Sequence, residues 1–130
     1  MDACDAARRW GRTWQYAWPR KDVEAIASLY RDDCLYRALV HREPERGVRG
    51  VRAYLTREFA VEEKITCSFG EPVCGDGRAA VQWWASWTEG GRDLTMAGVT
   101  VLRFDNNGLV VDHRDYWNEV DGRSEAFPDW

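Results

Sequence analysis

Apolar residues recur every three or four positions through the first half of the chain. Residues 3–18 keep this spacing up to Pro19, which predicts a helix that ends before the proline, because the residue before a proline is pushed out of the helical region. The same spacing predicts a helix over residues 22–31, capped by Asp22, and another over residues 50–60. The first half is therefore expected to be mainly helical.

Alternation of apolar and polar residues replaces the helical spacing in the second half. This pattern predicts strands at residues 64–69, 78–88, 93–104 and 109–117. In the first half only residues 34–38 resemble a strand, and the charged stretch 40–49 is expected to be a loop. Helices followed by consecutive strands predict an α+β fold, with helices on one face of a mainly antiparallel sheet and a single domain over residues 1–130.

The strand predicted at residues 109–117 carries side chains suited to chemistry. An Asn-Gly pair precedes it and favours a tight hairpin turn back to the strand before it. Successive side chains of a strand point to opposite faces. One face therefore holds Val111, His113, Asp115 and Trp117, and the other holds Val110, Asp112, Arg114 and Tyr116. We expect the face with Asp115 to point inward.

Composition narrows the classes of partner. The net charge is −4 at pH 7, which argues against binding to nucleic acid or anionic membranes, because both require a basic surface. No apolar run approaches the ~20 residues of a membrane span. The sequence also lacks the spacing of a metal site and a phosphate-binding loop, so we expect no metal and no cofactor.

The four cysteines, at positions 4, 34, 67 and 74, have no paired spacing. We expect them to be buried free thiols, which are typical of a reducing compartment. The amino terminus lacks the basic and apolar segments of a signal peptide. Together these features predict a cytoplasmic protein.

Three segments resemble the nuclear transport factor 2-like superfamily, and most closely its SnoaL-like polyketide cyclases and limonene epoxide hydrolases. They are residues 22–33, 97–104 and 108–117, and the similar order of elements covers nearly the whole chain. The resemblance implies a cone-shaped half-barrel, in which three N-terminal helices pack on a strongly curved sheet around an apolar pocket. Isomerases, cyclases, dehydratases, hydrolases and binding modules share this fold, so the fold alone does not define an activity.

Two catalytic positions carry over from the epoxide hydrolases. Asp115 matches their water-activating aspartate, and Tyr36 matches a tyrosine that holds the water. The rest of that catalytic set has no counterpart, because their asparagine corresponds to Ala38 and residues 79–85 contain neither arginine nor an acid. The resemblance therefore implies SnoaL-type chemistry, in which a single pocket carboxylate moves protons.

The other candidate site residues follow from alternation. His113 shares a face with Asp115 at roughly 7 Å, where it would orient a substrate or share a proton; a purely structural role is equally consistent with the sequence. Gly98 would leave room for a ligand or, alternatively, mark a bend in the sheet. Four tryptophans are expected either to line the pocket or to serve only as core: Trp14, Trp83, Trp87 and Trp117.

Apolar residues also occupy the face of the sheet that is expected to point outward. These residues are Trp84, Val99, Val101 and Val110. A face in contact with water would carry fewer apolar side chains, so this set predicts a homodimer through the convex side of the sheet.

The sequence thus favours a small-molecule enzyme of the SnoaL-like type. We expect Asp115, with Tyr36 and His113, to transfer protons on an apolar or aromatic substrate, in a cyclisation, isomerisation or dehydration. The charged form of Asp115 would be disfavoured beside tryptophans unless Tyr36, His113 or water donates a hydrogen bond to it. The alternative is a non-catalytic module of the same fold that binds a small ligand or a partner protein.

Overall fold

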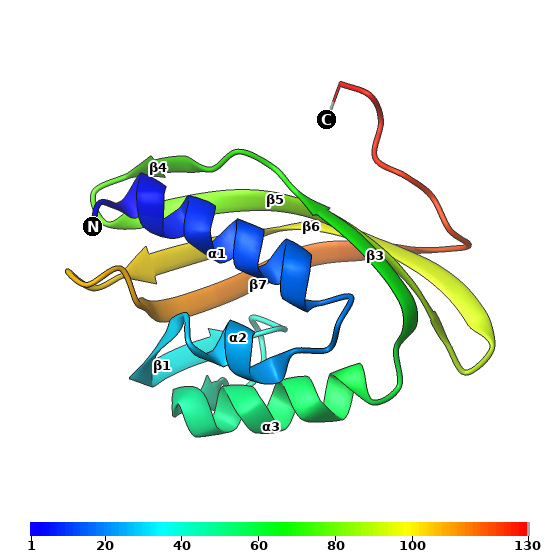
Figure 1. Ribbon diagram of the computed structural model, residues 1–130, viewed down its shortest axis with the longest axis horizontal. Coiled ribbons are helices and arrows are strands. Elements are labelled where there is room, and N and C mark those ends of the chain that lie inside the picture. Colours follow the sequence, from blue (N-terminus) through cyan, green and yellow to red (C-terminus); the bar gives the residue numbers. More distant parts are fainter. Residues whose placement is uncertain (130) are drawn as a thin grey trace.

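The computed structural model describes residues 1–129, and within this range it contains three helices and seven strands. The helices are α1 (Ala3–Ala17), α2 (Val23–Ala27) and α3 (Gly47–Phe59). The strands are β1 (Tyr30–Arg37), β2 (Glu45–Arg46), β3 (Glu63–Phe69), β4 (Val73–Gly75), β5 (Arg78–Glu89), β6 (Arg92–Phe104) and β7 (Val110–Asp121). Figure 1 shows the helices on one face of the sheet, which confirms the α+β class.

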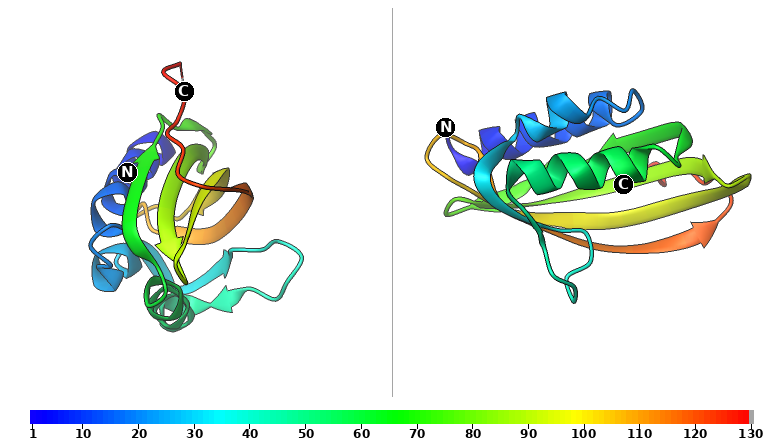
Figure 2. Two further views of the ribbon diagram at one scale, coloured as in Figure 1. Left: turned by 90° about the vertical axis from the view of Figure 1, so that its right-hand side faces the viewer. Right: turned by 90° about the horizontal axis from the view of Figure 1, so that it is seen from below.

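The strands form one mixed, mostly antiparallel sheet. Their order is β2-β1-β7-β6-β5-β3, with β4 paired to β5, and only β1 and β7 run parallel. The β5–β6 pairing keeps one register along its whole length, so no bulge bends the middle of the sheet. The sheet twists beneath the helices (Figure 2), and the strong curvature that the resemblance implies is not confirmed.

The second helix is shorter than the sequence predicts. It ends at Ala27, and Tyr30, which we expected on the helix, begins β1 instead. At the start of the parallel β1–β7 pairing, the backbone N–H of Val110 donates to the carbonyl of Leu29 at 2.9 Å. Pairing with a strand distant in the sequence therefore takes this segment out of the helix.

The third helix begins at Gly47 rather than at Gly50, and the expected loop before it contains β2. Gly47 has a φ angle of +69°, and a Cβ atom there would lie 2.6 Å from the carbonyl oxygen of Asp32. Only glycine adopts this angle readily and permits such a close approach. Gly47 thus lets the chain turn from β2 into α3 against β1.

Aromatic side chains fill the space between α1 and the inner face of the sheet. Trp10 and Trp14 lie at successive turns of α1, and Trp18 is the residue that caps its carboxyl end. Asp2 caps the amino end by accepting from the backbone N–H of Asp5 at 2.8 Å. The rings of these tryptophans pack against Phe69 of β3, and the ring of Trp18 also packs against Trp83 and Trp87 of β5. The same side chains form both the core and the wall of the cavity described below.

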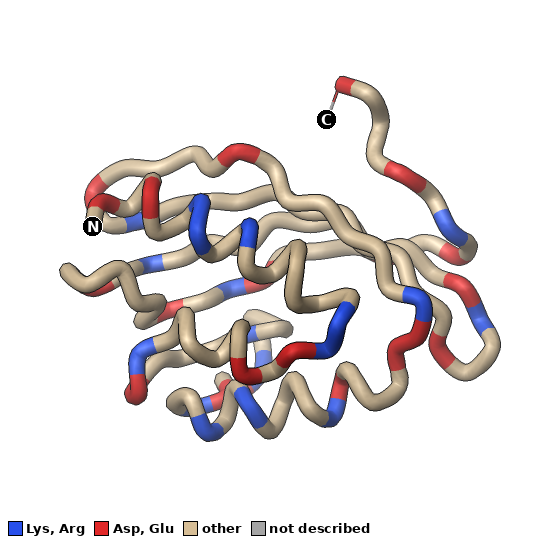
Figure 3. The backbone as a smooth tube through the Cα atoms, in the orientation of Figure 1, with Lys and Arg blue, Asp and Glu red and all other residues tan. Residues whose placement is uncertain are grey.

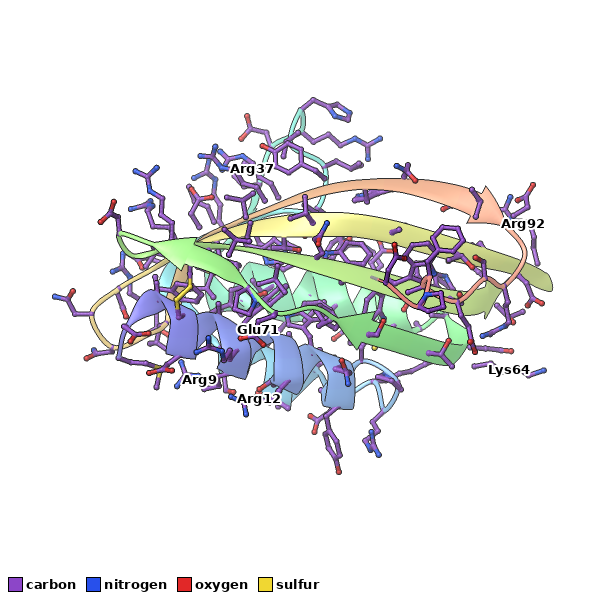
Figure 4. All side chains as sticks on the ribbon, turned by 90° about the horizontal axis from the view of Figure 1, so that it is seen from above. Arg9, Arg12, Arg37, Lys64, Glu71 and Arg92 are labelled. Carbon is purple, nitrogen blue, oxygen red and sulfur yellow. A yellow bond between two sulfur atoms is a disulfide. The ribbon has the colours of Figure 1, made fainter. Side chains whose placement is uncertain are left out.

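Two of the four cysteines are paired, contrary to the sequence prediction. Cys4 of α1 and Cys74 of β4 form a disulfide, seen in yellow in Figure 4, whereas Cys34 and Cys67 are free. The two partners are 70 residues apart, and only the packing of α1 beside β4 brings them together. Disulfides persist in oxidising compartments, so the cysteines do not support a cytoplasmic location. No helix within residues 1–129 is long and apolar enough to cross a membrane.

A bulge at the start of β7 changes which side chains point inward. Leu102 pairs with His113, but Phe104 pairs with Val110, so the β6–β7 register shifts and leaves Val111 as the extra residue. Val110 is consequently fully buried in the core. The prediction that Val110 lies on the outward face is wrong, because period-two alternation does not hold across a bulge.

The other outward residues differ in their exposure. Val101 is 38% exposed and Val99 is half-buried. Trp84 is covered by the segment that follows β7, since its indole N–H donates to the carbonyl of Ser124 at 2.7 Å and its ring packs on Phe127. Dimerisation through this face stays a prediction.

Candidate functional site

A cavity of about 520 Å³ lies between the helices and the inner face of the sheet. α1, α3 and strands β1, β3, β5, β6 and β7 all contribute to its wall. Its aromatic lining residues are Trp10, Trp14, Trp18, Tyr36, Tyr54, Phe59, Phe69, Trp83, Trp87 and Trp117. A cavity of this volume and character suits a small organic molecule.

The charged part of the lining is mainly acidic. Arginine is represented by Arg42, Arg57 and Arg92. The carboxylates are Glu43, Glu45, Glu58, Glu62, Glu89, Asp115 and Glu119. Figure 3 shows acidic residues on the β5–β6 hairpin and on the connection from α3 to β3, at one end of the molecule. Among the described residues no cluster of His, Cys, Asp and Glu side chains is suited to a metal ion.

Asp115 points into this cavity from β7, as predicted. Its side chain is only 13% exposed. The hydroxyl of Thr100, the residue opposite on β6, donates to Oδ1 of Asp115 at 2.6 Å. Nε2 of His113 lies 2.8 Å from the same oxygen. Asp115 and His113 therefore form a pair on one strand face, as alternation predicts.

Tyr30 determines which nitrogen of His113 carries the proton. The hydroxyl of Tyr30 accepts from the indole N–H groups of Trp10 at 3.0 Å and Trp14 at 3.3 Å, and it lies 2.9 Å from Nδ1 of His113. Burial raises the pKa of Tyr30 well above its ordinary value, so the hydroxyl keeps its proton. Because indoles can only donate, that proton goes to Nδ1. With Nδ1 as an acceptor, the proton of the imidazole lies on Nε2 and is donated to Asp115.

Trp83 orients the second donor in the same way. Its indole N–H donates to Oγ1 of Thr100 at 2.8 Å, which leaves the Thr100 proton free to be donated to Asp115. Two oriented donors thus hold Oδ1 of Asp115. The other oxygen, Oδ2, has no donor among residues 1–129 and is the one available to a ligand.

Tyr36 lies beside this pair but contacts it through its ring. The ring is stacked on the His113 imidazole, with 3.8 Å between centroids and 21° between planes. Burial is also the main reason why the pKa of Tyr36 is well above its ordinary value. Tyr36 therefore fixes the plane of the imidazole and presents a protonated hydroxyl to the cavity that it lines.

The four tryptophans predicted at the pocket all line the cavity. Trp14 and Trp83 also serve the hydrogen-bond network, through Tyr30 and Thr100 respectively. Trp87 donates to Oε1 of Glu89 at 3.2 Å, and Trp117 donates to the carbonyl of Ala38 at 3.0 Å. Core and pocket are thus not alternatives for these residues.

Gly98 does not leave room for a ligand, contrary to the prediction. It is absent from the cavity lining. A Cβ atom at Gly98 would lie 2.8 Å from Cβ of Trp117 and would contact the carbonyl oxygen of Tyr116. The space is filled by β7, so this glycine permits close approach of the two strands and thereby positions Trp117.

Sequence reasoning missed Glu62, which lines the cavity near Trp18. Glu62 is only 5% exposed, and its Oε1 accepts from the Trp18 indole N–H at 2.8 Å. Burial raises the pKa of Glu62 to about 7, and the charges of Glu58 and Glu89 add to the effect. Neighbouring Glu63 is exposed. Nothing in two adjacent glutamates at a helix–strand connection indicates which one points inward.

Two solved structures are similar to this chain at low sequence identity. The crystal structure of RV0760c from Mycobacterium tuberculosis has a TM-score of 0.75 and 19% identity, over 94% of this chain and 99% of that one. A hypothetical protein of Catenulispora acidiphila with a ketosteroid isomerase-like fold, in complex with trimethylamine, has a TM-score of 0.71 and 16% identity, over 81% of this chain and 82% of that one. These likenesses show the fold.

Sequence comparison adds the family. Residues 9–113 match the SnoaL-like domain. This range runs from α1 to His113 on β7 and contains Tyr30, Tyr36 and Thr100. Together with the ketosteroid isomerase-like arrangement of helices and sheet, the match identifies the chain as a member of the SnoaL-like domain family.

Proposed function

We propose that this protein is a small-molecule enzyme in which Asp115 transfers a proton inside the aromatic cavity. The observation that carries the proposal is that the two carboxylate oxygens of Asp115 differ in their hydrogen bonding. Oδ1 is held by Thr100 and His113, whereas Oδ2 has no donor among the described residues. A base held in one orientation and open to a ligand on one side is what general acid–base catalysis requires.

The reaction begins when Oδ2 of Asp115 takes a proton from an acidic C–H or O–H group of the substrate. The electron pair left behind forms the double bond of an enolate, attacks a carbonyl carbon of the same substrate to close a ring, or expels a hydroxide group. Asp115 then returns the proton to a different carbon, to the new alkoxide or to the departing hydroxide, which leaves as water. The donated hydrogen bonds on Oδ1 stabilise the carboxylate between turnovers. This sequence corresponds to isomerisation, cyclisation or dehydration, and it needs no redox partner.

The lining supports a substrate that is apolar or aromatic. Ten aromatic side chains line the cavity among the described residues, and they offer contact area with few hydrogen-bonding groups. The Catenulispora protein of this fold is in complex with a small molecule, trimethylamine, which supports use of the fold for small ligands.

A non-catalytic binding module is the second candidate. Several indole N–H groups of the lining already donate to protein partners, namely Tyr30, Thr100, Ala38 and Glu89. Because these indoles have no donor left for a ligand, they would bind one by shape and apolar contact, which favours this candidate. The two candidates differ in whether removing the Asp115 charge abolishes turnover or leaves the function intact.

The test uses 5-nitrobenzisoxazole, an aromatic probe that reports any accessible base. Removal of its C3 proton forms a nitrile, breaks the N–O bond and releases a coloured phenolate. We expect the wild-type protein to catalyse this ring opening and Asp115→Asn to be slower by ~10²-fold or more. Asp121→Asn, an exposed change on the same strand, is the matched control and should keep the wild-type rate.

Equal rates for wild type and Asp115→Asn would contradict the catalytic proposal. If Asp115→Asn still binds the probe with the wild-type affinity while wild type shows no turnover, the binding module is the better description. Native mass spectrometry of the purified protein would then identify the molecule that the cavity retains.

A further inference from the structure

Proton transfer by Asp115 leaves a second buried carboxylate of the cavity unused. Glu62 follows α3, and its backbone N–H donates to the carbonyl of Phe59 at 3.3 Å, which holds the side chain at the cavity wall. Its Oε1 accepts from Trp18. Its Oε2 has no donor among residues 1–129, and the residue lines the cavity. A buried carboxylate with one free oxygen is costly unless something pairs with it.

The aromatic rings around Glu62 are suited to a cation. The ring centroid of Trp18 lies 5.5 Å from that of Trp14, 5.7 Å from that of Trp87 and 6.1 Å from that of Trp83. The faces of such rings carry negative potential, and an ammonium group within about 6 Å of a ring centroid is attracted to it. The carboxylate of Glu62 and the faces of these rings thus both favour a positively charged group.

The other charged side chains near Glu62 strengthen the preference of this part of the cavity for a cation. Glu58 of α3 and Glu89 of β5 both raise the pKa of Glu62, and Lys21 is the neighbouring cation that opposes them. Two arginines of the lining are already paired, Arg57 with Glu45 at 3.5 Å and Arg92 with Glu119 at 3.4 Å. Figure 4 shows Arg92 and Lys64 at one end of the molecule. An anionic ligand would meet uncompensated carboxylates here, whereas a cation would neutralise one.

We propose that Glu62 and the indole rings of Trp14, Trp18, Trp83 and Trp87 bind the ammonium group of an organic amine. The apolar or aromatic body of the amine fills the rest of the cavity towards Asp115. This assignment of a substrate class rests on the proposed function, in that it takes the same cavity as the substrate site. Trp18 orients the carboxylate through Oε1, and Oε2 receives the ligand. Glu62 selects the ligand, and Asp115 carries out the proton transfer.

The experiment compares two probes of the same shape. Benzyltrimethylammonium carries a permanent positive charge, and neopentylbenzene is its neutral isostere. Binding to the wild-type protein is followed by quenching of tryptophan fluorescence. We expect the cation to bind at least about tenfold more tightly than the neutral probe, a difference of ~1.4 kcal/mol.

Variants identify the carboxylate responsible. Glu62→Gln keeps the side-chain shape and should remove most of the preference for the cation, while the affinity for neopentylbenzene changes by less than about threefold. Glu63→Gln makes the same change at the adjacent, exposed position and should bind like wild type. Glu62→Asp retains the charge and should keep a preference for the cation, which separates loss of charge from loss of structure.

The pH dependence provides an independent readout, because the charge on benzyltrimethylammonium does not titrate. The pKa of Glu62 is about 7 in the free protein, and the cation binds the deprotonated form. Affinity for the cation should therefore fall as the pH is lowered below about 7, towards the affinity of Glu62→Gln, and should level off above it. Glu58, Glu89 and Lys21 face Glu62, so Glu62→Gln must abolish this dependence if Glu62 is its source.

The outcomes separate this inference from the proposed function. If both probes bind wild type equally, or if Glu62→Gln keeps the preference for the cation, the amine assignment is wrong while the cavity remains a ligand site. If neither probe binds, the amine assignment is wrong, and the proposed function is judged separately by the ring-opening assay with Asp115→Asn. A cation preference that is lost only in Glu62→Gln supports the assignment.

Discussion

At the scale of single residues, the site depends on the direction of a few protons. Two indoles donate to Tyr30 and one donates to Thr100. Because indoles cannot accept, each hydroxyl must pass its own proton onwards, to His113 and to Asp115. Side chains of the core thereby set the hydrogen-bond donors on the Asp115 carboxylate. Buried tryptophans at this site orient hydrogen bonds as well as fill space.

The raised pKa of Glu62 predicts that the stability of the protein depends on pH. Burial raises this pKa from 4.5 to about 7, so between these values the folded protein holds a proton that the unfolded chain has released. By linkage, stability falls as pH rises through this window, by up to ~3 kcal/mol, and the loss is complete above the folded pKa. Glu62→Gln should therefore lack this loss.

The measurement is urea unfolding of wild type, Glu62→Gln and Glu63→Gln at about pH 5 and about pH 8. Glu62→Gln should gain on wild type at the higher pH only, whereas Glu63→Gln should follow wild type at both. A gain of the same size at both values would mean that the charge of Glu62 is not the cause. A substitution that keeps the side-chain shape and stabilises the fold is expected where a residue serves binding rather than folding.

At the scale of elements, strand pairing overrides local preference. β1 pairs in parallel with β7, shortens α2 and brings Tyr30 to His113. The bulge at Val111 turns Val110 into the core without disturbing the alternation of His113 and Asp115 further along β7. The His113–Asp115 pair thus lies beyond the irregular part of the strand, where register with β6 is regular.

The disulfide links two elements, α1 and β4, that are far apart in the sequence and packed together in the fold. Cys4 lies in the first turn of α1 and Cys74 on the short strand β4. The link closes a long loop of the unfolded chain, so its removal should lower the free energy of unfolding by about 4 kcal/mol in the chain-entropy description. The double variant Cys4→Ser, Cys74→Ser should show this loss in urea unfolding under non-reducing conditions.

Reducing agent provides the control for this prediction. It should destabilise wild type to a similar extent and leave the double variant unchanged, because Cys34 and Cys67 are already free. Wild type that is insensitive to reduction would show that the pair contributes nothing to stability.

At the scale of the whole molecule, one face of the sheet forms the cavity and the other is left to solvent and to the segment after β7. Tyr116 is 45% exposed and Val101 38% exposed on that outer face. Apolar exposure of this kind is typical of an interface between copies of a chain. We expect sedimentation velocity at tens of micromolar to give a dimer for wild type.

Val101→Asp should shift this dimer to monomer, because it places a charge in an apolar contact. Val61→Asp, an apolar and 50% exposed position in the connection from α3 to β3, should leave the dimer intact. A wild-type monomer, or a dimer that survives Val101→Asp, would contradict association through this face.

The sequence alone determined the features that depend on local periodicity and on family likeness. Helical and alternating spacing predicted the α+β class, and alternation together with the family resemblance predicted that His113 and Asp115 share an inner face. These features depend on residues close together in the chain, for which backbone geometry fixes the relative direction of side chains.

Only the tertiary structure decided the features that depend on distant segments. It paired Cys4 with Cys74, turned Glu62 inward, used Gly98 for strand packing and joined Tyr30 to His113. Each of these contacts joins residues far apart in sequence, and no local period encodes which of two adjacent glutamates or which cysteine pair will meet. The acidic end of the cavity, and with it the proposed preference for amines, exists only because the fold gathers α1, α3 and β5 around Trp18.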